Sequence, residues 1–150
     1  MQVVIEQAAV PDIPALSDLL TLLFTQETEF TPNAQAQRSG LAQIIGNPDV
    51  GTVLLARHDG QVVGMVNLLF TVSTALGARV VMLEDMIVSP EARGKGVGAR
   101  LLAAAVSYAR AQGFKRITLL TDRSNEIAQA FYGSQGFEVS AMVPMRLVLE

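Results

Sequence analysis

The amino-acid sequence predicts a mixed α/β fold in which helices flank one β-sheet, and three observations support this prediction. Half of the 150 residues are hydrophobic, which is enough for a substantial core. Strand-like and helical patterns alternate along the chain. A front half rich in hairpin signals is followed by a strand–helix–strand crossover, which mixes antiparallel with parallel pairing. The length predicts a single domain over residues 1–150.

The expected elements follow from apolar periodicity and from the positions of glycine and proline. In chain order they are a strand at 3–8, a helix from Pro11, a helix at 33–45, strands at 52–57, 62–70 and 80–88, a helix at 98–112, a strand at 116–121, a helix at 125–132, and strands at 137–140 and 142–149. They predict a mixed, mostly antiparallel sheet of six to seven strands flanked by about four helices.

The elements of the first half are defined by one apolar helix face and one hairpin signal. Asp12 is a plausible N-cap for the first helix. The inward face of that helix consists of Ile13, Leu16, Leu19, Leu20 and Leu23. The second helix should end at Gly46-Asn47-Pro48. The turn signal His58-Asp59-Gly60 joins two strands and makes His58 a solvated turn residue. Residues 71–79 are expected to form a looser connection.

The elements of the second half are a helix, a buried strand, a short helix and a final hairpin. The helix over 98–112 should end at Gly113. Its expected inward residues are Leu101, Leu102, Ala105, Tyr108 and Ala109. The run over 116–121 shows no polar alternation beyond threonine, which predicts a buried central strand. The short helix should end at Gly133.

Composition and charge exclude several classes of function. The chain has no cysteine, which excludes disulfides and thiolate sites and predicts a reducing, cytoplasmic compartment. No His or Cys cluster suggests a metal, so none is expected. The first residues lack a signal-peptide pattern and no run is long enough to span a membrane, so no membrane association is expected. A net charge of −3 argues against a nucleic-acid partner.

The two parts of the chain differ in charge. Residues 1–90 hold nine acidic and three basic residues, whereas residues 91–150 hold eight basic and five acidic ones. The basic part suits a polyphosphate ligand, and the acidic part suits a cationic co-substrate. Two solvated surfaces of different composition would give the same counts.

The most informative stretch is Val88-Ser89-Pro90-Glu91-Ala92-Arg93-Gly94-Lys95-Gly96-Val97-Gly98, which follows a strand and opens into a helix. Three glycines in five residues let the backbone approach a ligand closely. Arg93 and Lys95 add positive charge to the partial charge of a helix N-terminus. This combination predicts a binding site for a pyrophosphate.

Three known phosphate-binding patterns compete for this loop. A Walker A loop fails because Gly96, rather than Ser or Thr, follows Lys95. A dinucleotide fingerprint fails because Pro90 and its neighbours separate the strand from the glycines and because residues 101–120 contain no acid. The pattern Arg93-x-x-Gly96-x-Gly98 is the third, and it resembles the pyrophosphate loop of the GNAT acetyltransferase superfamily.

The resemblance to the GNAT superfamily covers nearly the whole chain. It is carried by Val88-x-Pro90-x-x-Arg93-Gly94-x-Gly96-x-Gly98, by Asn125-x-x-Ala128-x-x-Phe131-Tyr132-x-x-x-Gly136-Phe137, and by the hairpin Asp59-Gly60-x-x-Val63-Gly64. Two signatures at this separation and in this element order are far more specific than either one alone. The resemblance implies the acyl-CoA N-acyltransferase fold, with a sheet splayed between strands 4 and 5, and acetyl-CoA as co-substrate.

The resemblance also implies where acetyl-CoA would bind. Splayed strands leave unpaired backbone groups that the amide-rich pantetheine arm can satisfy like an added strand. The family pattern places these contacts on Met86, Ile87 and Val88, with an N–H near Met86 polarising the thioester carbonyl. The diphosphate would lie on the amides of Arg93, Gly94, Lys95, Gly96, Val97 and Gly98.

Four further residues are the candidates for the chemistry. The resemblance implies that Asn125 contacts the pantetheine arm and that Tyr132 binds near it and protonates the departing thiolate. Asn125 could instead cap its helix, and Tyr132 could simply pack in the core. Adjacent acids in an apolar strand, Glu84 and Asp85, should point to opposite faces. Either is a candidate general base, but water or a purely structural role for each stays open.

The sequence therefore predicts an acetyl-CoA-dependent N-acetyltransferase that acts on a primary amine of a small molecule or peptide by direct attack. The substrate side is expected at the first two helices, residues 68–79 and the last hairpin, with Glu27, Glu29 and Phe30 near a cationic amine. The alternative is a non-catalytic acyl-CoA sensor, which would need neither Tyr132 nor a base. A homodimer is common in the family, but no residue pattern here determines it.

Overall fold

The computed structural model of the chain describes residues 1–27 and 29–150. It contains two compact units, residues 1–120 and 121–150, and each is described by itself below. The prediction of a single domain stays a prediction. The helices and strands of the first unit are β1 Val4–Gln7, α1 Ile13–Gln26, α2 Ala34–Ile45, β2 Gly51–His58, β3 Gln61–Ser73, β4 Ala78–Val88, α3 Val97–Ala111 and β5 Ile117–Leu119; the second unit holds α4 Glu126–Ser134.

The first unit is built on one mixed sheet whose strands follow chain order, β1-β2-β3-β4-β5. The first four strands pair antiparallel, and β5 pairs with β4 in parallel. A parallel pair needs a crossover connection, and α3 supplies it between β4 and β5. These observations confirm the mixed, mostly antiparallel sheet and its crossover.

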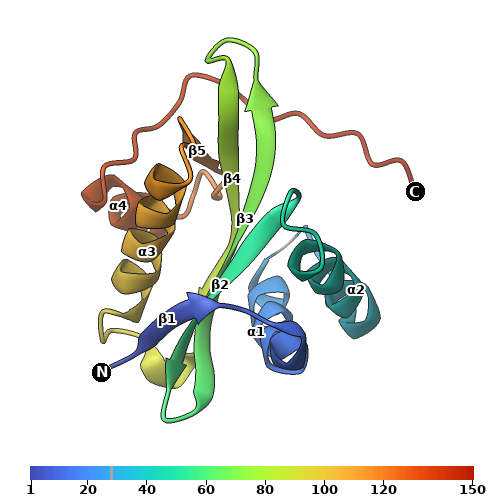
Figure 1. Cartoon of the computed structure of the whole chain (residues 1–150), viewed down its shortest axis with the longest axis vertical. Helices are drawn as coiled ribbons and strands as arrows, with labels where there is room; N and C mark the ends of the chain where they lie inside the picture. The colour runs from blue at the N-terminus through green and yellow to red at the C-terminus, as the bar shows by residue number, and fades with distance from the viewer. Residues whose placement is uncertain (28) are drawn as a thin grey trace. The chain divides into compact units, whose positions relative to one another are not determined.

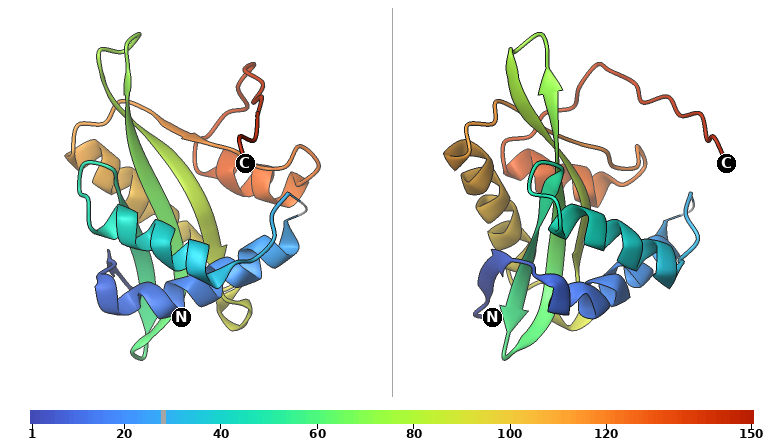
Figure 2. Two further views of the ribbon diagram at one scale, coloured as in Figure 1. Left: turned by 90° about the vertical axis from the view of Figure 1, so that its right-hand side faces the viewer. Right: turned by 45° about the vertical axis from the view of Figure 1, so that its right-hand side comes forward.

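Helices cover both faces of this sheet. Figures 1 and 2 show α1 and α2 together on one face and α3 on the other. Because both faces are covered, the central strands β2 and β3 are buried over continuous runs rather than at alternate residues. On the side of α1 and α2, the core consists of Leu16, Leu19, Leu20, Leu41, Val53, Leu55, Met65 and Ile87. The predicted inward faces of α1 and α3 are confirmed.

A buried polar side chain joins α1 to α2. The side chain of Gln37 donates to the Ser17 carbonyl at 3.0 Å and to the Thr21 hydroxyl at 3.0 Å. Its amide oxygen accepts from the backbone N–H of Asn33 at 2.8 Å. The polar atoms of a buried amide are thereby satisfied, which makes the contact stabilising. The two helices are held in register at the end where they approach β3 and β4.

A glycine of β3 sets how closely α3 approaches the sheet. A Cβ at Gly64 would lie 2.9 Å from Cδ1 of Leu101 and 3.5 Å from Cγ1 of Val97. Both contacts are to the first turns of α3, which is therefore packed directly on the β3 backbone. The absence of a side chain at residue 64 thus positions the start of α3 and the glycine-rich loop before it.

One expectation about the first unit was wrong, and a second held only in part. Residues 71–79 are not a loose connection, because β3 and β4 extend as a long hairpin with Ser73 paired to Ala78. Asp12 is the N-cap residue of α1 as expected, but its side chain makes no capping bond; its carboxylate instead accepts from the Ala9 N–H at 2.9 Å and from Arg57 at 2.9 Å. Asp12 closes a short 3₁₀ turn, which the helical periodicity could not distinguish from the helix start.

The second unit contains α4 and an extended C-terminal segment. Asn125 is the N-cap of α4, as one of the two sequence interpretations proposed. The ring of Tyr132 packs between Phe131 and Phe137, with centroid separations of 5.2 and 5.8 Å. These three aromatic residues form the apolar cluster of this unit.

The predicted strands at 137–140 and 142–149 are absent from the described structure. The described sheet therefore has five strands rather than six to seven, and β5 is a half-buried edge strand instead of a buried central one. Strand formation requires a neighbour that exchanges N–H and C=O groups, and Pro144 has no N–H to exchange. The segment instead makes a local turn in which the Ser140 hydroxyl accepts from the Met142 N–H at 3.0 Å. Among the described residues, no helix is long and apolar enough to cross a membrane.

Candidate functional site

The glycine-rich loop enters α3 through two left-handed residues. Gly94 and Gly96 have φ values of 74° and 82°. A Cβ is strained at such angles, so the sequence needs glycine at both positions. Gly96 is also the N-cap of α3, and the first intrahelical bond runs from the Arg100 N–H to its carbonyl at 3.1 Å. The loop therefore turns sharply into the helix, as the sequence predicted.

Four backbone N–H groups precede the first intrahelical bond of α3, and they belong to residues 96–99. Such groups carry partial positive charge and bind anions. The predicted residues Arg93, Gly94, Lys95 and Gly96 are solvent-exposed, whereas Val97 is buried and anchors the helix to the sheet. The arrangement suits an extended anionic group in front of the helix.

Arg93 also organises the loop. Its Nε donates to the carbonyl of Val88 at 3.0 Å, which connects the loop to the last residue of β4. The backbone N–H of Ser89 donates to the Val63 carbonyl at 2.8 Å. The strand end and the loop are thus fixed to each other and to β3. One of the three carbonyls predicted to meet a pantetheine arm, that of Val88, is already bonded to this side chain.

Strand β4 has an open edge next to the loop. Its pairing with β5 covers only Val81, Met82 and Leu83, which face residues 117–119. The remaining residues, Glu84 to Val88, continue past the end of β5. This is the predicted splay between the fourth and fifth strands. It leaves a sheet edge to which an extended ligand rich in amide groups can add.

A bulge interrupts β4 at the start of this open edge. Between the pairs Met65–Ile87 and Asn67–Glu84, β3 advances by two residues and β4 by three. Asp85 lies in the extra stretch and has a φ of 56°, which is uncommon for a residue other than glycine. Strained backbone of this kind is concentrated at functional sites. The regular strand assumed for Glu84 and Asp85 was therefore wrong, because the bulge redirects the second carboxylate.

The two acidic residues have different environments. Glu84 is exposed, whereas Asp85 is half-buried and accepts a hydrogen bond from Nδ2 of Asn67 at 2.7 Å. Burial raises the pKa of the Asp85 carboxyl, the Asn67 hydrogen bond opposes this increase, and the Glu84 charge adds to it. A carboxylate with a raised pKa is a better proton acceptor than an ordinary one. Asp85 is therefore the stronger candidate base of the two.

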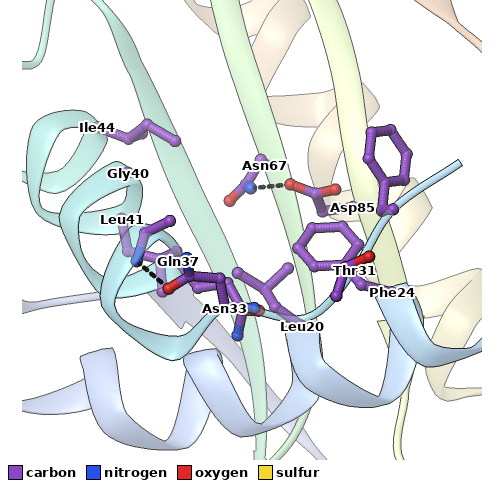
Figure 3. A pocket seen from close by; sticks show the side chains of 12 residues that line it. Leu20, Phe24, Thr31, Asn33, Gln37, Gly40, Leu41, Ile44, Asn67 and Asp85 are labelled. Atoms are coloured by element: carbon purple, nitrogen blue, oxygen red, sulfur yellow. Dashed lines mark hydrogen bonds between the residues drawn. The ribbon is translucent and has the colours of Figure 1, made fainter. Parts of the chain in front are cut away.

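A cavity of about 280 Å³ lies in front of Asp85, between α1, α2 and the sheet. Figure 3 shows Asp85 and Asn67 on its sheet wall. Its lining residues are Leu20, Phe24, Phe30, Thr31, Asn33, Ala36, Gln37, Gly40, Leu41, Ile44, Asn67 and Asp85. Phe30 was expected on the substrate side and does line the cavity, whereas Glu27 and Glu29 do not line it.

Asn67 was missed in the sequence. It is the one polar side chain in the run Val62–Phe70, and that exception within an otherwise apolar strand is the signal that could have identified it. It is 3% exposed, and its Oδ1 has no hydrogen-bond partner within residues 1–27 and 29–150. The other cavity residues come from α1, α2 and the segment between them, and no local pattern could have grouped these helices with Asn67 and Asp85.

The remaining predicted residues belong to the second unit. The side-chain oxygen of Asn125 accepts from the Ala128 N–H at 3.0 Å, so capping uses the oxygen and leaves the NH₂ group outside this bond. Burial raises the pKa of the Tyr132 phenol, which keeps it protonated at neutral pH. A protonated phenol can donate a proton to a stronger base.

Comparison with known proteins gives these features a context. A sequence model of the "Acetyltransferase (GNAT) family" matches residues 14–137, which include the loop, the bulge and α4. The chain belongs to the GNAT acetyltransferase family. Like other GNAT enzymes it is an acetyl-CoA-dependent acetyltransferase.

Individual GNAT relatives match along nearly the whole chain. An uncharacterized N-acetyltransferase of Bacillus subtilis, YhfO, is 35% identical over 89% of each chain. The aminoalkylphosphonate N-acetyltransferase of Salmonella typhimurium is 29% identical over 91% of this chain and 85% of its own. A predicted acetyltransferase of Clostridium acetobutylicum, solved with acetyl-CoA, has the same fold with a TM-score of 0.81, 18% identity, and coverage of 99% and 97%.

Proposed function

We propose that the chain transfers the acetyl group of acetyl-CoA to a primary amine of a small molecule by direct attack. The single observation that supports this most strongly is the bulge of β4. It places a half-buried carboxylate, Asp85, at the start of the open strand edge and on the wall of the cavity between α1, α2 and the sheet. A thioester lying along the edge and an amine in the cavity would then meet at this bulge.

The loop and the open edge would hold acetyl-CoA. The diphosphate fits the backbone N–H groups in front of α3, with Arg93 and Lys95 supplying full charges. The pantetheine arm fits the edge of β4 over Met86, Ile87 and Val88, and Asn125 would bind the arm through its NH₂ group. The backbone N–H of Met86 would donate to the thioester oxygen as negative charge develops there.

The reaction then consists of a proton transfer to Asp85, transfer of the acetyl group, and protonation of the thiolate. Asp85 accepts the proton of the acceptor's ammonium group, and the neutral nitrogen attacks the thioester carbon. The C–N bond forms, the tetrahedral intermediate collapses, and the C–S bond breaks. The departing thiolate takes the phenolic proton of Tyr132, which is protonated at neutral pH. The second proton of the former ammonium passes through solvent to the Tyr132 phenolate as the intermediate collapses, and Asp85 releases its proton to solvent, so both residues return to their starting states.

The experiment that tests this function is acetyl transfer from acetyl-CoA, followed as free thiol, with a panel of primary amines. Release that depends on the amine supports an enzyme. A protein that binds acetyl-CoA but releases no thiol with any amine is the acyl-CoA sensor considered above, and that result would refute the proposal.

Reversal of one charge in the loop should weaken cofactor binding specifically. Arg93→Glu removes a positive charge, adds a negative one and breaks the bond to the Val88 carbonyl. We expect the dissociation constant for acetyl-CoA to rise at least tenfold at low salt, since each charge pair is worth about 1 kcal/mol at contact in water. Calorimetric titration measures the dissociation constant. The difference between the wild type and Arg93→Glu should narrow in 1 M salt, because the salt screens the attraction between the loop and the diphosphate.

Arg110→Glu is the matched control for this substitution. It makes the same charge change on an exposed residue at the opposite end of α3. At about 0.15 M salt it should leave the affinity for acetyl-CoA within about twofold, because the screening length is then about 8 Å, well below the length of α3. Equal losses in both variants would show that overall charge, rather than the loop, determines binding.

A further inference from the structure

We propose that Asn67 and Asp85 together bind the amino group of the acceptor, and that this acceptor is a primary amine on a small, uncharged, apolar body. The inference rests on the acetyltransferase function proposed above and specifies its substrate class. It depends on which polar atoms of the cavity wall are already bonded and on what surrounds them.

Two hydrogen-bond acceptors on the sheet wall have no donor among the residues that the structure describes. Nδ2 of Asn67 donates to Oδ2 of Asp85, and this bond fixes the orientation of the amide, because a carboxylate only accepts. The amide oxygen therefore points away from Asp85 and into the cavity, as Figure 3 shows. It is buried and unpartnered. The second oxygen of the Asp85 carboxylate is the other acceptor without a hydrogen bond here.

The Gln37 amide and the side-chain oxygen of Asn33, which also line the cavity, have structural partners. Gln37 bonds to α1 and to the Asn33 N–H. Asn33 caps α2 by accepting from the Ala36 N–H at 3.1 Å. These side chains build the cavity and need no ligand. The buried unsatisfied side-chain atom of the described lining is the Asn67 oxygen, and it lies beside the Asp85 carboxylate; together they call for a ligand with at least two N–H donors on one atom.

A primary amine meets that requirement before and during the reaction. As an ammonium it has three N–H donors, enough for Asn67 and Asp85 together. After one proton passes to Asp85, the neutral nitrogen keeps N–H groups for the Asn67 oxygen while its lone pair becomes free to attack. An N,N-dimethyl amine has one N–H as a cation and none once neutral, so it cannot satisfy both acceptors.

The rest of the cavity determines the body of the acceptor. Apolar side chains from both helices and the intervening loop form its walls, chiefly Leu20, Phe24, Phe30, Leu41 and Ile44. Asp85 is the one ionisable residue of the described lining, and no lysine, arginine or histidine lines it. A second ammonium or a phosphonate would lie against apolar walls without a counter-charge, which is unfavourable. The volume of about 280 Å³ equals roughly nine water molecules, the size of a small amine.

This substrate class differs from that named for the Salmonella relative, whose acceptor carries a phosphonate. A phosphonate is held best by cationic side chains, whereas the described cavity wall carries one carboxylate and no lysine, arginine or histidine. The two proteins would therefore share the acetyl-CoA half and differ in the acceptor half.

The first test compares acceptors on the wild-type chain. We expect kcat/KM for 2-phenylethylamine to exceed that for 2-aminoethylphosphonate and for putrescine at least tenfold, read as thiol release at saturating acetyl-CoA. Higher kcat/KM for the phosphonate or the diamine would overturn the inference and leave the acetyltransferase function standing.

The second test isolates the acceptor pair and needs no turnover. Calorimetry should show 2-phenylethylamine binding at least tenfold more tightly than its N,N-dimethyl analogue. In Asn67→Leu, which removes the amide but keeps most of the volume, this ratio should fall to near one. If the role of Asn67 were purely structural, Asn67→Leu would weaken the binding of both ligands by the same factor. An unchanged ratio in the variant, or no preference in the wild type, refutes the pair.

A charge placed at the cavity rim gives a result even if Asn67→Leu does not fold. Phe30 lines the cavity and is 47% exposed, so Phe30→Arg should be tolerated. It should lower kcat/KM for 2-phenylethylamine about tenfold and raise that for 2-aminoethylphosphonate. Leu22→Arg, on α1 and outside the cavity lining, is the matched control and should change neither. Equal effects of both variants would overturn the assignment of this cavity.

The same data separate the two proposals. If 2-phenylethylamine binds with the expected preference but no amine releases thiol, the acetyltransferase function fails and the amine site stands. If thiol is released only with charged or phosphonate-bearing acceptors, the function stands and the inference fails.

Discussion

Asp85→Asn should lower kcat at least about a hundredfold and at the same time make the protein more stable. The rate falls because the amide cannot accept the ammonium proton, and general bases contribute about 10²–10⁴-fold. Asparagine suits this position sterically, since it tolerates a positive φ as well as aspartate does. A loss of activity therefore cannot be attributed to a disrupted bulge if stability rises.

The gain in stability follows from the raised pKa of Asp85. Its carboxyl is protonated more readily in the folded chain than in the unfolded one, mainly because it is buried. The stability that the Asp85 carboxyl contributes is fully present at pH values below its ordinary pKa of 3.8. It is lost as the pH rises through the pKa of the folded chain. The ionised group therefore destabilises the fold at pH 7, and the uncharged amide removes this cost. The difference in unfolding free energy between the two proteins should shrink as the pH falls toward 3.8.

Urea denaturation at several pH values and the pH profile of kcat/KM measure these effects. The wild-type rate should rise through a pKa above 3.8, and that limb should disappear in Asp85→Asn. Glu84→Gln is the comparison at the neighbouring residue, whose side chain is exposed. If Glu84→Gln abolishes turnover while Asp85→Asn retains it, the two acids have been assigned the wrong way round.

Tyr132→Phe should lower kcat about a hundredfold without changing the dissociation constant for acetyl-CoA. The substitution removes one hydroxyl and keeps the ring that packs between Phe131 and Phe137. The thiolate must then leave without a proton donor, which is the step that general acid catalysis assists. Steady-state kinetics and calorimetry together separate this effect from weaker binding.

Tyr108→Phe is the control, because the chain contains two tyrosines. Tyr108 lies on α3, where its ring stacks on Phe70 at a centroid distance of 6.3 Å. Tyr108→Phe should keep kcat within about twofold of the wild-type value. If Tyr132→Phe kept full activity, water would have to be the proton donor to the thiolate. Tyr132 would then contribute only to packing.

The fold was largely predictable because its signals are local. The apolar face of α1, the turn at Asp59-Gly60 and the left-handed glycines before α3 each produce structure from neighbouring residues. The strands at 137–140 and 142–149 were predicted from composition alone, although pairing depends on a partner elsewhere. Strand edges and lengths are settled by tertiary contacts that no local pattern contains.

The candidate site was predictable only in part, for the same reason. The loop and its glycines follow from sequence, since a helix start and positive φ values are local properties. The bulge at Asp85 does not, because the run from Val80 to Val88 resembles any regular apolar strand. The cavity groups Phe24, Asn67 and Asp85 from three elements, and only folding brings them together.

The most direct test of the central claim is the amide NMR spectrum of ¹⁵N-labelled protein during titration with acetyl-CoA. Glycine amides resonate in a separate region, so Gly94, Gly96 and Gly98 can be followed individually. We expect their N–H signals to move as they donate to the diphosphate, while Gly60 and Gly113, in turns remote in sequence from the loop, stay in place. Saturable binding of acetyl-CoA that leaves the three loop glycines unmoved would contradict the account.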